Sequence, residues 1–178
     1  MKKILHCVLL SICEVLTAHA QPAVPAGDKA AYQTLDRQAR QMGRAFSTGD
    51  YKTFSKFMNL ALIQASGGIA NIEAALVKVD ADMHSQGIKV IRIDFGVPSK
   101  IVRQGKELQC TLPQQTDYQL PSGKIRSTST LIAVSVDKGA NWTFIDTSNK
   151  DMQAIRKMLP NLSSAISIPP AGPPVRLP

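Results

Sequence analysis

Apolar residues recur at helical spacing near the start of the chain. Over residues 28–49 they return at intervals of four, four, three and four, which places them on one stripe of an amphipathic helix. Asp28 is the expected N-cap, because its carboxylate can accept unpaired backbone N–H groups. Gly49 is the expected end, because glycine tolerates a left-handed backbone. The stripe consists of Ala31, Leu35, Ala39, Met42 and Phe46.

Two further helices are predicted before the pattern changes. Asp50 can cap a short helix that carries Tyr51, Phe54, Phe57 and Met58. After Gly67 and Gly68 the apolar positions alternate spacings of three and four, and Gly87 closes this third helix. Its predicted buried stripe consists of Ile69, Ile72, Leu76, Val79 and Met83.

From residue 88 onward the sequence follows the period of two that strands require. Pro113 lacks an N–H group, so it predicts a bulge, a bend or an edge within one strand. The run 131–134 is apolar on both faces, which places it centrally in the sheet. The predicted strands cover 88–95, 100–104, 107–120, 125–136 and 142–146.

The end of the chain adds a short helix over 149–158 and a proline-rich tail over 169–178, expected to be extended and mobile. Helices therefore come first and strands afterwards, which predicts an α+β fold. We expect three N-terminal helices packed on one face of a curved antiparallel sheet. Residues 28–168 would form this single domain.

The strand over 107–120 supplies the best candidates for a pocket. If its register holds past Pro113, every second side chain from Leu108 to Leu120 shares the concave face. The first half of that face is apolar and the second half carries polar tips, as small-molecule pockets often do. No acid is evident on it. The candidate ligand-binding residues are Cys110, Gln114, Thr116 and Tyr118.

The first twenty residues have the features of a secretory signal. Lys2 and Lys3 precede a short apolar run, and Ala18-His19-Ala20 fits the cleavage rule. We expect cleavage after Ala20, a linker over 21–27, and a periplasmic or secreted protein of a Gram-negative bacterium. A lipoprotein signal ending at Cys13 is the alternative, which the bulky Ile12 before that cysteine disfavours.

Removal of this signal would leave one cysteine, Cys110, and one histidine, His84. One cysteine cannot form an internal disulfide, and a structural zinc site needs about four ligands, so no metal or cofactor is expected. A nucleophilic mechanism that needs histidine would depend on His84, four residues after Asp80. Both lie on a polar stripe, which indicates a solvated helix face. Cys110 itself is expected to be a small buried apolar residue.

The composition is globular and basic. The 178 residues are 44% hydrophobic and 19% charged, with a formal net charge of +8. Cleavage would leave 19 Lys and Arg against 12 Asp and Glu. That charge would serve solubility or attract anionic envelope components. The basic residues are scattered and aromatic residues make up 5%, so no nucleic-acid partner is expected, and neither is a transmembrane segment.

The order of elements resembles the nuclear transport factor 2-like superfamily. The resemblance covers about residues 28–147 and depends on the junction Ser47-Thr48-Gly49-Asp50-Tyr51, the short helix after it and the long strands. It implies helices packed into a strongly bent sheet around a cone-shaped cavity. The superfamily contains isomerases, dehydratases, transport adaptors and binding domains, so this resemblance does not select a function.

A shorter resemblance lies at residues 135–142. The sequence Ser-Val-Asp-Lys-Gly-Ala-Asn-Trp is similar to the Asp-box hairpin of sialidases, although Asn141 replaces the usual threonine. We expect a structural turn in which Asp137 binds amides, Gly139 takes a positive φ and Trp142 covers the turn. The alternative is a glycan-binding role for Trp142. The chain is too short for a sialidase propeller.

Three functions remain open from the sequence. The first is a non-enzymatic exported domain that binds a small apolar or amphipathic molecule or docks an envelope partner. The second is an isomerase or lyase of the steroid-isomerase type that uses Tyr118 with a carboxylate inside the same cavity. The third is a module that forms a homodimer through the outer face of its sheet.

Overall fold

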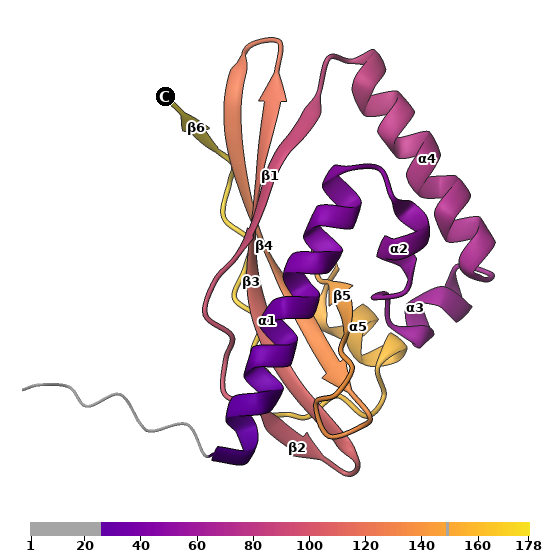
Figure 1. Ribbon diagram of the computed structural model, residues 1–178, viewed down its shortest axis with the longest axis vertical. Helices are drawn as coiled ribbons and strands as arrows, with labels where there is room; N and C mark the ends of the chain where they lie inside the picture. Colours follow the sequence, from indigo (N-terminus) through magenta and orange to yellow (C-terminus); the bar gives the residue numbers. More distant parts are fainter. Residues whose placement is uncertain (1–25, 149) are drawn as a thin grey trace, which may run out of the picture.

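The computed structural model describes residues 26–148 and 150–178. It confirms the α+β class: N-terminal helices precede an open antiparallel sheet, and a short helix follows (Figure 1). The predicted signal, its cleavage after Ala20, the lipoprotein alternative and most of the 21–27 linker lie outside the described residues.

Between residue 26 and the first strand the structure has four helices, where three were predicted. They are α1 (Ala26–Ser47), α2 (Tyr51–Ser55), α3 (Leu60–Ala65) and α4 (Ile69–Ser85). The predicted cap at Asp50 is confirmed, since its carboxylate accepts the Thr53 N–H at 3.0 Å. The second predicted helix ends at Ser55, before Phe57 and Met58, and the additional helix α3 begins after Asn59, whose side chain accepts the Ala61 N–H at 3.0 Å.

The start of α1 corrects one expectation. The helix begins two residues before Asp28, so Asp28 lies in the first turn and is not the N-cap. A carboxylate in that turn complements the helix dipole. Its Oδ1 also accepts a hydrogen bond from Arg103 at 2.9 Å, which joins the helix to β2 (Val102–Gln104).

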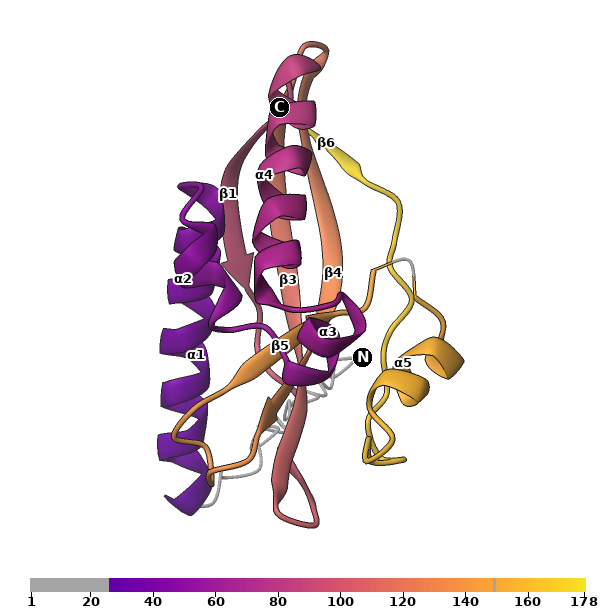
Figure 2. The same ribbon diagram turned by 90° about the vertical axis from the view of Figure 1, so that its right-hand side faces the viewer.

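The remaining strands are β1 (Lys89–Phe95), β3 (Glu107–Leu120), β4 (Gly123–Ser135), β5 (Thr143–Asp146) and β6 (Val175–Leu177). The main path runs β1-β3-β4-β5, with β2 on β3 and β6 on β4 (Figure 2). Every pairing is antiparallel. The C-terminal helix α5 (Met152–Met158) starts three residues later than predicted.

Pairing between β3 and β4 runs without a shift from Leu108 opposite Ser135 to Leu120 opposite Gly123. The register therefore holds past Pro113. The Pro113 carbonyl accepts the Gly96 N–H at 2.9 Å, at the point where β1 has ended. In a strand the N–H and the C=O of one residue point to the same side. The N–H that Pro113 lacks would therefore also point toward the end of β1, where no further strand residue needs it. The pairing with β4 shows no bulge at Pro113, and β3 is an interior strand, so Pro113 lies at a point where the neighbouring strand β1 has ended.

A bulge in β1 changes which of its residues face inward. The pairing shifts between Val90 and Arg92, so Ile91 is displaced and is 47% exposed. Regular alternation along residues 88–95 would place Ile91 on the core face with Ile93 and Phe95, but the bulge removes it from that face, and Val90 takes the place opposite Tyr118. Arg92 and Asp94, two positions apart on one face of β1, form a surface ion pair.

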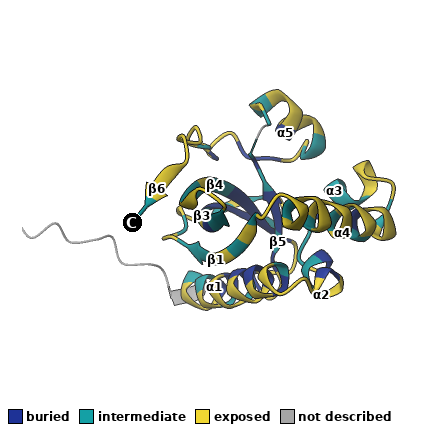
Figure 3. Ribbon diagram, turned by 90° about the horizontal axis from the view of Figure 1, so that it is seen from above, coloured by how far each residue is buried: buried dark blue, intermediate teal, exposed yellow. Residues whose placement is uncertain are grey.

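Two apolar clusters lie on opposite faces of β4 (Figure 3). One joins the α1 stripe, including Leu35, to inward side chains of β3, β4 and β5. The other packs Ile132 and Val134 against Ile155 of α5 and residues after it. Burial of β4 on both faces confirms its predicted central position.

Gln38 of α1 is bonded to the hairpin before β5. Its Nε2 donates to the Ala140 carbonyl at 3.1 Å, and its Oε1 accepts the Trp142 N–H at 2.7 Å. These hydrogen bonds join residues 102 and 104 positions apart in the sequence. They fix α1 against the hairpin that precedes β5.

The fourth helix does not pack directly on the sheet, which corrects the expectation for residues 69–83. α4 packs against α2 and α3 and leaves most of its surface exposed (Figure 3). Ile72 is buried, whereas Ile69 and Val79 of the predicted stripe are exposed. The inward side carries Glu73, whose carboxylate accepts a 2.7 Å hydrogen bond from the buried Ser55 hydroxyl.

The proline-rich tail returns to the sheet. Residues 175–177 form β6, which pairs with Lys124, Ile125 and Arg126 of β4. The tail is extended as expected, but its end is docked on β4, which the sequence did not predict. An edge strand pairs on one side only, so it needs fewer backbone N–H donors than an interior strand. A segment rich in proline can therefore occupy this position.

On the outer face of the sheet, the carboxylate of Asp117 is closely paired with Arg126. Arg126 donates to Asp117 through Nε at 2.6 Å and through a terminal nitrogen at 2.8 Å, and the Asp117 side chain is 8% exposed. The hydrogen bonds from Arg126 hold the pKa of Asp117 below its usual range. Asp117 is therefore excluded from any pocket on the inner face.

We expect Asp117→Asn to destabilise the protein by about 1.5–3 kcal/mol at pH 7, the usual contribution of charge-assisted hydrogen bonds. Because the folded pKa is depressed, this stabilisation is complete above the ordinary aspartate pKa of about 3.9 and is lost as pH falls through the folded value. Urea unfolding at pH 7 and at pH 3 measures the difference. Asp36→Asn, in the exposed Asp36–Arg40 pair, is the control; equal losses in both variants at pH 7 would contradict the prediction.

Candidate functional site

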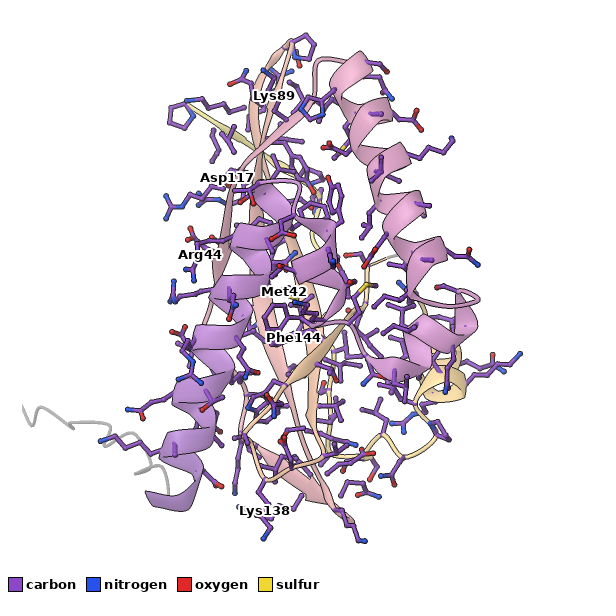
Figure 4. All side chains as sticks on the ribbon, turned by 45° about the vertical axis from the view of Figure 1, so that its right-hand side comes forward. Met42, Arg44, Lys89, Asp117, Lys138 and Phe144 are labelled. Atoms are coloured by element: carbon purple, nitrogen blue, oxygen red, sulfur yellow. The ribbon has the colours of Figure 1, made fainter. Side chains whose placement is uncertain are left out.

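A cavity of about 180 Å³ lies between the helices and the inner face of the sheet. Figure 4 shows Met42 of α1 and Phe144 of β5 close together in this interior region. Its apolar wall is built largely from aromatic and sulfur-containing side chains, with partners from α2, α3 and β4. The main apolar lining residues are Met42, Phe46, Phe54, Met58, Leu131 and Phe144.

Three of the four candidate ligand-binding residues line this cavity. Gln114, Thr116 and Tyr118 lie at every second position of β3, so the pleat turns all three inward. Gln114 Nε2 donates to the Thr116 hydroxyl at 3.4 Å. Burial raises the pKa of Tyr118, so its hydroxyl stays protonated at neutral pH and can donate a hydrogen bond.

Cys110 lies on the same strand face but does not line the cavity. It is fully buried in the cluster beneath α1, beside Leu108 and Leu112. Burial raises the pKa of its thiol to about 12, so the thiolate form is scarce at neutral pH. Its expected role as a small buried residue agrees with this position, and the structure gives it no access to a ligand.

Asp146 is a lining residue that the sequence analysis did not single out. It is the last residue of β5, pairs with Leu131 across the strands, and points into the cavity. Its Oδ1 accepts the Ser148 N–H at 2.7 Å. The alternation of Trp142, Phe144 and Asp146 on one face was visible in the sequence, and extending the strand analysis to this segment would have found the acid.

The hairpin at residues 135–142 is held by its own side chains. Asp137 accepts the Asn141 N–H at 2.8 Å and its side-chain amide at 2.7 Å, while the Ser135 hydroxyl accepts the Gly139 N–H at 2.9 Å. Trp142 is 1% exposed. A buried indole cannot stack on a sugar at the surface, so the glycan-binding alternative for Trp142 is wrong.

His84 lies outside the cavity, at the exposed end of α4. Its Nδ1 is 2.8 Å from the Asp80 carbonyl and 3.2 Å from the Asp80 carboxylate. Within residues 26–148 and 150–178, no group of three potential ligands gathers to hold a metal ion. None of the helices in these ranges has the length and apolar character needed to cross a membrane.

No protein-family model matches the chain, and no curated protein is similar to it in sequence. What the cavity can bind therefore follows from its own side chains. They provide an amide, two hydroxyls and one carboxylate beside an apolar wall. This arrangement can hold an apolar body and orient one polar end.

Proposed function

We propose that this protein is a non-enzymatic binding domain that holds one small amphipathic molecule in the cavity between α1 and the sheet. One observation carries the proposal: Gln114, Thr116, Tyr118 and Asp146 converge on an otherwise apolar space. Isolated polar groups in an apolar pocket are the usual means of orienting a ligand.

The volume limits the ligand to about one ring. An apolar cavity of about 150 Å³ binds benzene, whereas pockets for drug-sized ligands measure about 300–1,000 Å³. A space of about 180 Å³ therefore suits a single ring with a short polar substituent. A steroid is too large for it.

We propose in addition that the fold is of the nuclear transport factor 2-like type, in which helices and a bent sheet enclose a cone-shaped cavity. A long helix beside the inner face of an antiparallel sheet, with a cavity between them, supports it. The position of α4 away from the sheet departs from the expected packing. We also retain export to the periplasm or beyond, which would make an envelope or external compound the ligand.

Benzyl alcohol is a suitable first probe, because it combines one ring with one hydroxyl. We expect saturable binding of one molecule per chain by calorimetry. Leu131→Phe should weaken it at least tenfold, because the added ring occupies part of the cavity that Leu131 lines. Leu120→Phe, on the neighbouring strand but outside the lining set, is the matched control. Unchanged binding in Leu131→Phe would contradict the proposed site.

A second candidate function is an isomerase or lyase, and Asp146 is the observation that favours it. Tyr118 and Asp146 line one cavity, as that hypothesis requires of a tyrosine and an acid. Asp146 would remove a proton next to a carbonyl, and Tyr118 would donate a hydrogen bond to the developing oxyanion. Within the described residues no hydrogen bond joins the two side chains, so a substrate would have to lie between them.

The test is isomerisation of 3-cyclohexenone to 2-cyclohexenone, a one-ring enone substrate that matches the cavity. The enzyme hypothesis expects a rate above background that Asp146→Asn and Tyr118→Phe each reduce at least 100-fold. Proton NMR in D₂O would follow both the rearrangement and the exchange at the carbon next to the carbonyl. A rate equal to that of buffer in the presence of folded protein removes this reaction.

A further inference from the structure

We propose that the bound molecule is a monocation, a one-ring amine whose ammonium group meets the Asp146 carboxylate. This inference rests on the proposed binding function and names the chemical class of its ligand. It follows from the charge of the cavity, from the unbonded oxygen of that carboxylate and from the aromatic side chains that line the cavity.

The charge of the cavity is uneven. Of the lining residues in the described part of the chain, Asp146 alone carries a formal charge, and none is Lys, Arg or His. A ligand that fills the space removes water from this carboxylate. A neutral ligand would leave the loss of hydration uncompensated, and an anion would add repulsion.

One oxygen of Asp146 is available to a ligand. Its Oδ1 is occupied by the Ser148 N–H, while no donor among the described residues bonds to Oδ2. The nearby Lys150 ammonium donates instead to the main-chain oxygens of Asp146 at 3.0 Å and Ser148 at 3.5 Å. In the described residues it forms no ion pair with the carboxylate. An ammonium group has the donors that Oδ2 lacks.

Aromatic side chains add a second attraction for a cation. Phe46, Phe54 and Phe144 all line the cavity, and the rings of Phe46 and Phe54 pack at a centroid distance of 5.1 Å. The faces of aromatic rings attract ammonium groups, more strongly where water is excluded. The Tyr118 and Thr116 hydroxyls can accept further N–H hydrogen bonds.

The basic surface of the protein does not reverse the preference of the cavity for a cationic ligand. Exposed charges act through solvent and are screened over about 8–10 Å at physiological salt. A net charge of +8 therefore slows the approach of a cation. The groups in direct contact decide which ligand remains bound.

Three ligands of almost equal size test the inference at neutral pH: benzylamine, benzyl alcohol and benzoate. We expect benzylamine to bind at least tenfold more tightly than benzyl alcohol by calorimetry, and benzoate to bind least. Asp146→Asn should remove the preference for the amine, because asparagine keeps an oxygen for the Ser148 N–H but has no negative charge to meet the ammonium group.

Asp151→Asn is the control, because it removes one carboxylate close in sequence but outside the cavity lining. The Asp151 side chain caps α5 by accepting the Ala154 N–H at 2.7 Å, a role that asparagine also performs. This variant should retain the full preference for benzylamine. Thermal unfolding of both variants would show whether they remain folded.

The outcomes separate the inference from the proposed function. If benzyl alcohol binds as tightly as benzylamine, or if Asp146→Asn retains the preference, the cationic ligand is wrong and the binding function stands. If none of the three ligands binds the folded full chain, the cavity does not serve one-ring ligands and both proposals fail. The comparison of ligands on the unmodified protein needs no variant, so it holds even if Asp146→Asn does not fold.

Discussion

Replacement of Gly139 by alanine is expected to lower the free energy of unfolding by about 3 kcal/mol or more. Gly139 has a φ of +91°, a conformation that costs an L-residue about 1–2 kcal/mol. A Cβ atom there would also lie 2.6 Å from the Cβ of Ala31 and 3.1 Å from its Cα. The hairpin and α1 would have to move apart, which disturbs a packed contact.

Gly105→Ala is the matched comparison for this prediction. Gly105 also lies in a tight turn and has a φ of +59°, but a Cβ atom added there meets nothing within 4 Å. We expect a loss of about 1–2 kcal/mol, from the backbone conformation alone. Urea unfolding of the two variants measures the difference, and equal losses would mean that the contact with Ala31 is easily relieved.

Truncation of Leu35 to alanine is expected to cost about 3–5 kcal/mol, the range for a large cavity left in a packed core. Leu35 is 0% exposed and lies at the centre of the α1 stripe, against the inner face of the sheet. It does not line the ligand cavity. Thermal and urea unfolding should therefore show a large loss of stability, with ligand affinity retained at temperatures where the variant is folded.

Leu60→Ala is the control, because it makes the same truncation of leucine to alanine at an exposed position. Leu60 is 63% exposed in the short helix α3, so the same truncation should change stability by about 0.5 kcal/mol or less. A similar loss in both variants would contradict the prediction, because Leu35 would then not occupy the core that the structure describes.

The parts of the fold that follow from local chemistry were predictable from the sequence. The alternation over 107–120 anticipated β3 and placed Gln114, Thr116 and Tyr118 on one face, as the β3–β4 register shows. Asp50 at the cap depends on contacts within a few residues. Each of these features depends on spacing, which the sequence states directly.

Features set by long-range packing were not predictable in the same way. α4 packs against α2 and α3 and is joined to α2 by the Ser55–Glu73 hydrogen bond, contacts between helices that no spacing within α4 reveals. The bulge at Ile91 depends on how β1 meets β3. Alternation within β5 places Asp146 on the same face as Phe144, but only the pairing of β5 with β4, Asp146 opposite Leu131, brings that face to the cavity.

The two hydrogen bonds of Gln38 have a consequence for the way the chain folds as it is made. The partners of Gln38 are Ala140 and Trp142, 102 and 104 residues later. These two hydrogen bonds therefore cannot fix α1 until Trp142 has been made. At about 5–20 residues per second, synthesis of that stretch takes roughly 5–20 s. Until then the hydrogen bonds that join α1 to the hairpin before β5 cannot form, so α1 reaches its final position late in synthesis.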